Sequence, residues 1–362
     1  MSTEYTLNIP TATHNQVVLF DTPLDASLLR QYDHILLVID QRVRGIKDVG
    51  AFVDNIKKLK KEVRETSFHI NSFIKNTNLL LTVLDSMACF GLTRKSLIIA
   101  IGGGSIGDLV GVAASMYMRG IDYAVIPTNY ISMTDGIIGK VAVNHAGHKN
   151  LIGSFKSPIW ILINSSLLGS LPKREIYFGL VEVWKHTLIT NNATKREKVE
   201  NILLNGAASN ELIELAMWSM TVKSKFVLPD WNDTNSVHKA LSLGHTLANY
   251  LEESKHLFHA EAVMYGIVFE VVIAKKLGAI SDGRFDEIIK TAVVFEREFR
   301  KLDSIKHALL PKTLHDFLLR DKISHHNSII FTLPTDHGYT VKEIDEEILS
   351  STIKEFNDLK LT

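Results

Sequence analysis

Residues 97–116 read LIIAIGGGSIGDLVGVAASM, and this stretch decides the fold class. A short apolar run leads into three consecutive glycines, and a segment of small residues follows with an aspartate in its first turn. This order is typical of a strand that ends in a glycine turn and opens a helix, where backbone N–H groups and the positive helix end can hold a pyrophosphate. The spacing differs from G-x-G-x-x-G, so the pattern alone also fits a purely structural tight turn.

The first half of the chain repeats the same rhythm of short apolar runs and helical patterns. This alternation predicts strands joined by crossover helices in a parallel sheet. The predicted strands cover residues 35–39, 97–101, 123–127 and 159–163. After residue 171 strand signals nearly vanish, and long segments with helical periodicity follow. We therefore predict an α/β fold, with a Rossmann-like parallel sheet domain over residues 1–170 and an all-helical domain over residues 171–362.

Composition limits the possible partners and compartments. Among the 362 residues, 40 Lys and Arg balance 40 Asp and Glu, so no overall charge would attract nucleic acid or an anionic membrane. The single cysteine, Cys89, excludes an internal disulfide and suits a reducing compartment. No apolar run approaches the ~20 residues of a membrane span, and the first residues lack a signal-peptide pattern. We expect a cytoplasmic protein.

Polar residues follow two of the predicted strands. Thr128 comes after the third strand in IPTN, and Asp135 follows in MTDGIIGK. In open α/β sheets, ligands bind where successive strands end. The sequence thus favours a ligand site at this edge.

Three residues in the second half have the chemistry of a divalent metal site. Glu182, His245 and His259 offer one carboxylate and two imidazoles, a set that leaves coordination positions open for substrate oxygens. Each residue alone also fits a hydrogen-bonded structural role. Lys185 lies three residues after Glu182 on the same helix face, where it could meet a substrate or form an ordinary surface ion pair.

A further group of residues is basic or amide-bearing. Its members are Arg119, Lys140, Lys149, Asn150 and Lys223. Cations and amides beside backbone turns bind phosphate well, so the group indicates an anionic substrate. The alternative is a set of dispersed surface residues.

Five motifs in this order resemble the sugar phosphate cyclase superfamily, whose best-known member is 3-dehydroquinate synthase. They are GGGSIGD with YMRG, PTN with TDGIIGK, NHAGHKNLIGSFKSP, FGLVEVWK, and SLGHT with HAEAV. The resemblance implies an NAD-binding domain, a helical domain that binds Zn²⁺ or Co²⁺, a homodimer, and a small sugar phosphate as substrate. It also implies a reaction in which NAD takes and returns a hydride, phosphate leaves, and the sugar closes into a carbocycle.

The resemblance also assigns roles to individual residues. The dinucleotide contacts would be Lys75, Gly102, Gly103, Gly104, Ser105, Asp108, Thr128, Asp135 and Lys149. The metal ligands would be Glu182, His245 and His259. The substrate contacts would be Lys140, Asn150 and Arg119 for phosphate, with Arg119 reaching a neighbouring subunit, and Lys185 and Lys223 for the ring hydroxyls and acid group, beside the catalytic Asp135.

The chain departs from this pattern where substrate is recognised. His238 and Ser242 stand where dehydroquinate-forming enzymes usually have Arg and Asn, and Asn249 stands where a second histidine is usual. Residues 71–72 read Asn-Ser in place of Gly-Glu, and residues 321–323 read Asp-Lys-Ile in place of Asp-Lys-Lys. A substrate carboxylate that loses a bidentate arginine is poorly paired, at a cost of ~2 to 5 kcal/mol.

Four interpretations remain open from the sequence. We favour a cyclase with altered substrate recognition, because the metal and dinucleotide motifs are kept while the carboxylate contacts change. A divergent 3-dehydroquinate synthase, a zinc polyol dehydrogenase of similar architecture, and a non-catalytic homologue are the alternatives.

Overall fold

A computed structural model describes the chain except residues 1–4, 12–14, 60–61, 137, 233–236, 256, 307–308, 310, 321–328 and 362. The chain forms two compact units. The first comprises residues 1–176 and 208–234, and the second comprises residues 177–207 and 235–362.

The first unit is built on a seven-stranded sheet with the order β1-β2-β9-β6-β5-β3-β4. The strands are β1 (Tyr5–Pro10), β2 (Asn15–Phe20), β9 (Trp160–Ile163), β6 (Asp122–Pro127), β5 (Leu97–Gly102), β3 (Ile35–Asp40) and β4 (Val63–Phe68). All neighbours pair in parallel except β1, which adds an antiparallel edge to β2. Strands β3 and β5 are buried at every position, as expected for parallel strands covered on both faces.

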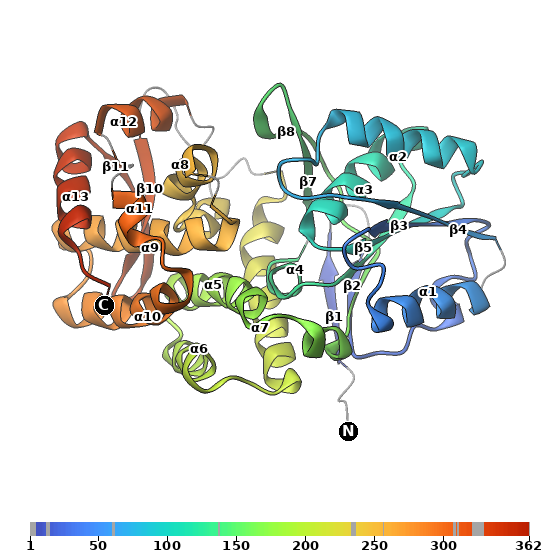
Figure 1. The fold of residues 1–362 in the computed structure, drawn as a ribbon, viewed down its shortest axis with the longest axis horizontal. Helices are drawn as coiled ribbons and strands as arrows, with labels where there is room; N and C mark the ends of the chain where they lie inside the picture. The colour runs from blue at the N-terminus through green and yellow to red at the C-terminus, as the bar shows by residue number, and fades with distance from the viewer. Residues whose placement is uncertain are drawn as a thin grey trace. The chain divides into compact units, whose positions relative to one another are not determined.

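Helices on both faces of the sheet create a topological switch point between β3 and β5. Helix α1 (Lys47–Leu59) carries the chain from β3 outward to β4, whereas α3 (Gly104–Met116) carries it from β5 the opposite way to β6. Because such crossovers are right-handed, α1 lies on one face, and α2 (Thr77–Cys89) and α3 lie on the other (Figure 1). The carboxyl ends of β3 and β5, at Asp40 and Gly102, are therefore the expected ligand crevice of this sheet.

Other elements complete the first unit. They are the hairpin of β7 (Lys140–His145) and β8 (His148–Phe155), the short helix α4 (Tyr130–Thr134), helix α7 (Ser209–Val227), and the 3-10 turns η1 (Ala26–Leu28), η2 (Tyr117–Arg119), η3 (Ser165–Ser170) and η4 (Leu228–Asp230). The hydroxyl of Tyr130 in α4 donates to the carbonyl of Leu212 in α7 at 2.8 Å, which fastens α7 to this unit.

The second unit is organised around α9 (His259–Lys276). Every residue from Ala260 to Ala274 is buried, so this helix lies in the middle of a core. It contacts α8 (His245–Lys255), α10 (Asp282–Phe299), α13 (Glu346–Asp358) and strand β10 (Ile329–Thr335). The remaining elements are α5 (Lys173–Ile189), which begins in the first unit, α6 (Ala193–Asn205), η5 (Val237–Ser242), α11 (Leu302–Lys306), α12 (Pro311–Arg320) and β11 (Gly338–Ile344).

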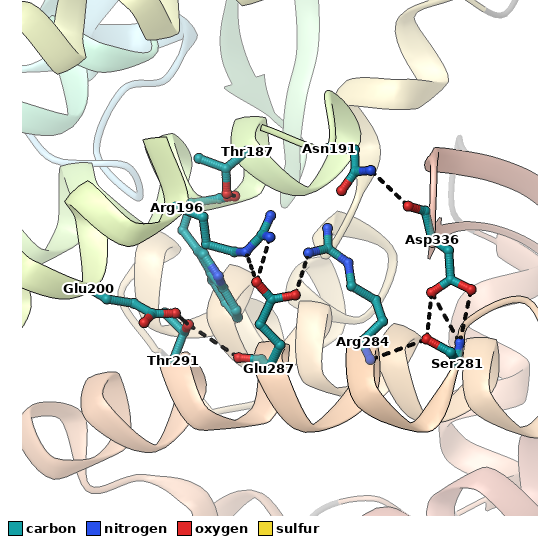
Figure 2. Close-up of polar contacts among 10 residues, drawn as sticks. Thr187, Asn191, Arg196, Glu200, Ser281, Arg284, Glu287, Thr291 and Asp336 are labelled. Carbon is teal, nitrogen blue, oxygen red and sulfur yellow. Dashed lines mark hydrogen bonds and ion pairs between the residues drawn. The ribbon is translucent and has the colours of Figure 1, made fainter. Parts of the chain in front are cut away.

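A polar network ties α6 to α10 in the second unit. The carboxylate of Glu287 receives the guanidinium groups of the two buried arginines Arg196 and Arg284 (Figure 2). Beside it, the carboxylate of Asp336, at the β10–β11 turn, accepts from the hydroxyl and backbone N–H of Ser281, which caps α10. These bonds fix the beginning of α10.

The fold class predicted from the sequence is confirmed. All four predicted strands are present as β3, β5, β6 and β9, and the second unit is helical with one added antiparallel hairpin, β10–β11. The domain boundary predicted after residue 170 stays a prediction. Each compact unit is formed from two separate stretches of the chain, so the units do not correspond to a single division of the sequence. Within the described residues, we find no helix long and apolar enough to cross a membrane.

Candidate functional site

The glycine junction of the first unit is shaped by close approach. Gly102 has φ +153°, and a Cβ there would lie 2.8 Å from both the Cβ of Asp40 and the Cγ2 of Ile106. A Cβ on Gly103 would lie 2.9 Å from the amide nitrogen of Asn129. Gly103 precedes α3 and provides no side-chain cap, so the backbone N–H groups in the first turn of α3 need acceptors from other groups. Any other residue at Gly102, the carboxyl end of β5, would therefore have to displace Asp40 or Ile106.

Several predicted dinucleotide contacts gather around this junction. The backbone N–H of Thr128 donates to the carbonyl of Gly102 at 2.9 Å, which places the end of β6 against the end of β5. Lys75 is buried and forms an ion pair with Asp108 in α3. Gly104 and Ser105 form the first turn of the same helix. A narrow backbone turn, a helix N-terminus and a buried lysine at a switch point fit a dinucleotide.

Asp40 is a candidate that the sequence analysis missed. It ends β3, is 1% exposed, and lies against Gly102. Its carboxylate accepts from the guanidinium of Arg42 at 2.6 Å and from the backbone N–H of the same residue at 3.0 Å. An acidic residue that closes a wholly apolar strand next to the glycine strand was the available signal.

Asp135 and Lys223, both in the first unit, are brought together. The Nζ of Lys223 lies 3.0 Å from Oδ1 of Asp135 and donates to the backbone carbonyls of Asp135 and Gly136 at 3.2 and 3.1 Å. Asp135 terminates α4, and Lys223 comes from α7. The sequence placed these two residues in separate groups, and the fold makes them one ion pair.

The β7–β8 register separates two of the predicted phosphate binders in the first unit. Lys140 opposes Phe155 in the β7–β8 register, whereas Asn150 lies five residues earlier on β8, roughly 16 Å away along the strand. Asn150 and Arg119 have left-handed backbone conformations, with φ +51° and +68°, and both are exposed. Lys149 lies 5.6 Å from the ring centre of Phe73. The roles of these residues stay predictions.

The second unit assembles the predicted metal ligands from three helices. Glu182 comes from α5, His245 begins α8, and His259 begins α9. One ligand atom from each lies within 4.8 Å of the others. Glu182 is wholly buried, whereas the side chain of His259 is 40% exposed. The set therefore combines a buried carboxylate with a solvent-exposed imidazole, and this exposed side would let substrate reach a catalytic metal.

Hydrogen bonds orient both imidazoles for metal binding. The Nδ1 of His245 lies 3.1 Å from the carbonyl of Leu243, and the Nδ1 of His259 lies 2.9 Å from the carboxylate of Glu252. With Nδ1 occupied, Nε2 is the remaining ligand atom of each ring, and the Nε2 of His259 lies 3.4 Å from Oε1 of Glu182. A metal-binding histidine that gives its other N–H to a carboxylate or carbonyl is the usual arrangement, so the donor set fits a divalent ion.

Lys185 adds a cation to this site. Its Nζ lies 2.5 Å from Oε2 of Glu182, and its side chain is 2% exposed. Burial alone would raise the pKa of Glu182, but Lys185 and the two imidazoles hold that pKa well below its ordinary value. Burial, aided by Lys185, lowers the pKa of His245, whereas Glu252 and Glu182 outweigh burial and raise the pKa of His259. Glu182 is therefore ionised and His245 neutral, as a metal needs, whereas His259 favours its protonated form, so a metal that binds its Nε2 would displace that proton.

Comparison with known proteins identifies the family. Residues 67–178 match the family described as 3-dehydroquinate synthase N-terminal, and residues 179–323 match 3-dehydroquinate synthase C-terminal. The 3-dehydroquinate synthase of Halalkalibacterium halodurans is 31% identical over 352 residues, which cover 95% of this chain and 93% of that protein. The chain belongs to the 3-dehydroquinate synthase family.

Solved structures share the fold of this 3-dehydroquinate synthase family member. A 2-epi-5-epi-valiolone synthase from Streptomyces hygroscopicus subsp. jinggangensis, with NAD⁺ and Zn²⁺ bound, has a TM-score of 0.83 at 21% identity, covering 97% of this chain and 98% of that one. A 2-deoxy-scyllo-inosose synthase complexed with carbaglucose-6-phosphate, NAD⁺ and Co²⁺ has a TM-score of 0.82 at 20% identity, covering 97% and 99%.

Three of the positions that depart from the 3-dehydroquinate synthase family pattern lie within seven residues of the predicted metal ligand His245 in the sequence. His238 is buried in η5, which ends at Ser242, and Asn249 is half-buried one turn into α8. Residues 71–72 belong to the first unit, and residues 321–323 lie outside the described residues. Glu252, which supports His259, was missed because a glutamate within a helical stretch gives no sign from sequence that it points inward.

Proposed function

We propose that this chain is a cytoplasmic, NAD- and Zn²⁺- or Co²⁺-dependent sugar phosphate cyclase that eliminates phosphate and closes a carbocycle, with altered substrate recognition. The observation that carries the proposal is the set of Glu182, His245 and His259, in which both imidazoles have Nδ1 engaged and Nε2 available. Membership of the 3-dehydroquinate synthase family supports the reaction class.

Two groups would supply the chemistry that side chains lack. When bound, the metal would act as a Lewis acid on substrate oxygens, held by Glu182, His245 and His259. When bound, NAD would supply a reversible hydride acceptor, with its pyrophosphate at Gly102–Gly104 and α3. The valiolone and deoxy-inosose synthases with similar folds carry NAD⁺ with Zn²⁺ or Co²⁺, which supports both assignments.

The chain's own residues would position the substrate and stabilise charge. Lys185 is held 2.5 Å from Glu182, so its ammonium can donate to a substrate oxygen while keeping that carboxylate ionised. Lys223 holds Asp135 at the end of α4 through its carboxylate and backbone carbonyl. Lys223 thereby fixes the orientation of Asp135 and still presents a positive charge to an anionic substrate.

Substrate recognition differs from that of dehydroquinate-forming enzymes. Histidine at position 238 lacks the rigid fork of N–H donors that arginine would present, and Ser242 is too short to replace asparagine without a bridging water. The loss of one charge-assisted pair is worth about 3 kcal/mol, or about a hundredfold in efficiency. We therefore propose a sugar phosphate without a carboxylate as the substrate.

The test is a panel of sugar phosphates, including the seven-carbon keto-acid phosphate that yields dehydroquinate, assayed for inorganic phosphate. We expect phosphate release with catalytic NAD, no accumulation of NADH, and no release by the His245→Ala variant. NADH formed in proportion to substrate would indicate a polyol dehydrogenase instead. A kcat/KM of ~10⁴ M⁻¹s⁻¹ or more on the keto-acid phosphate would identify a dehydroquinate synthase.

We also propose a homodimer in which Arg119 reaches the partner's substrate. Arg119 is exposed and its neighbours Met116 and Met118 are 53% and 46% exposed, so this end of α3 presents apolar side chains around a cation. Light scattering would give the oligomeric state. Mixing inactive Arg119→Ala subunits with inactive His245→Ala subunits should restore activity only if the arginine acts across the interface.

A further inference from the structure

We propose that Glu270 is a positioning residue for the metal ligand His245, acting through the backbone of Gly244. This inference rests on the metal site of the proposed function and names a residue outside the ligand set. Glu270 lies on α9, eleven residues after His259, and is 0% exposed. Its Oε2 accepts a hydrogen bond from the backbone N–H of Gly244, the residue directly before His245.

The backbone around Gly244 reaches α9 through an unusually close contact. Gly244 has φ +83°, and a Cβ on it would lie 2.7 Å from the backbone carbonyl oxygen of Val263 and from a side-chain carbon of Ile267. A Cβ on Gly266 would in turn lie 1.8 Å from the carbonyl oxygen of Gly244. The segment before α8 therefore sits directly on the surface of α9, where Glu270 can fix it.

The same segment also orients the ring of the ligand. The carbonyl of Leu243 lies 3.1 Å from the Nδ1 of His245, and the next residue donates its N–H to Glu270. Both bonds therefore hold the same peptide unit. Its carbonyl, from Leu243, faces the imidazole, and its N–H, from Gly244, donates to the side chain of Glu270. A shift of this peptide would rotate the imidazole and move Nε2 away from Glu182 and His259.

A carboxyl group is a costly choice at this position if it serves packing alone. Oε1 of Glu270 is buried without a hydrogen-bond partner among the described residues. Burying an unsatisfied polar atom costs about 1–3 kcal/mol, and an apolar residue of similar size would avoid it. The hydrogen bond to Gly244 offsets this cost, because the buried N–H of Gly244 would otherwise lack an acceptor.

The experiment compares the zinc affinity of purified variants by competition with a chelator. We expect Glu270→Met, which removes the acceptor, to bind Zn²⁺ about 10–100-fold more weakly than wild type. Glu270→Gln keeps a side-chain oxygen of the same reach and should restore affinity to within about threefold of wild type. Should Glu270→Met fail to fold, Glu270→Asp shortens the side chain by one methylene and should show the same weakening.

A matched control separates positioning from general stability. The ring of Phe269, the preceding residue of α9, contacts the rings of Phe331 and Phe356. Phe269→Leu should lower the thermal midpoint yet leave zinc affinity within about threefold of wild type. Wild-type affinity in Glu270→Met would overturn the inference, and so would equal weakening in Phe269→Leu. A wild-type protein that binds no zinc would instead overturn the proposed metal site itself.

Discussion

Replacing Gly266 by alanine should displace the segment that carries His245. The new Cβ would lie 1.8 Å from the carbonyl oxygen of Gly244, whereas ordinary contact begins at 3.4 Å, so one of the two backbones must move by about 1.6 Å. Helix α9 is buried along its length and contacts α8, α10, α13 and β10. The segment at Gly244 is therefore the part that gives way, and the ligand that follows it moves too.

The expected result is loss of zinc rather than loss of fold. Metal–ligand distances tolerate about 0.2 Å, so a shift of this size should weaken zinc binding by at least ~100-fold. The strain of overpacking should lower the free energy of unfolding by about 1–3 kcal/mol. Chelator competition measures the first effect, and chemical denaturation of the metal-free protein measures the second.

Gly283 provides the matched control, because it is also helical and a Cβ there meets nothing within 4 Å. Gly283→Ala should leave zinc affinity unchanged and stabilise the helix by about 0.5–1 kcal/mol. Wild-type zinc affinity in Gly266→Ala would refute the reasoning, since it would mean that the contact can relax without moving His245.

Three further predictions concern separate parts of the molecule. Glu252→Gln removes the charge behind His259 and should reduce zinc affinity about 10–100-fold by chelator competition, while the exposed neighbour change Glu253→Gln should have no effect; equal affinities would contradict this. Gly102→Ala, with φ +153° and two side chains at 2.8 Å from its Cβ, should abolish NAD binding in calorimetry without altering zinc affinity, and retained NAD binding would exclude the glycine junction as the dinucleotide site. Burial alone would raise the pKa of Glu287, but its partners Arg284 and Arg196 lower that pKa. The ionised Glu287 therefore stabilises the fold above pH ~4.5, and this stabilisation is lost as the pH falls through the lowered pKa. The urea midpoints of wild type and Glu287→Gln should converge in acid, and a difference that stays constant with pH would contradict this prediction.

The sequence predicted the centre of the sheet better than its edges. Strands β3 and β5 are covered on both faces, so each reads as an unbroken apolar run. Strand β4 (VRETSF) and strand β8 (HKNLIGSF) were not predicted, because they are partly exposed and carry mixed residues that no short pattern separates from a loop. The hairpin β10–β11 was not predicted, because it lies within a largely helical unit and its only short apolar run is IIFTLP in β10.

The sequence could indicate the predicted metal ligands because imidazole and carboxylate are the chemistry that a metal requires. Their supports were not accessible. Glu252 and Glu270 lie in helices where a glutamate is ordinarily on the surface, and only the packing of α8 on α9 turns both inward. The pairing of Asp135 with Lys223 likewise depends on α7 joining the first unit, although 88 residues separate the two side chains.

The membership of α7 in the first unit has a consequence for how the protein is made. During synthesis, β1 to β9 emerge from the ribosome first, and α5 and α6 of the second unit follow before α7. The first unit therefore cannot complete its packing until about Val227 has left the exit tunnel. By then α5 and α6 have emerged, but the later elements of the second unit on which they pack have not been synthesised. Nascent chains arrested shortly before Ser209 should be more sensitive to protease than those arrested well past Val227.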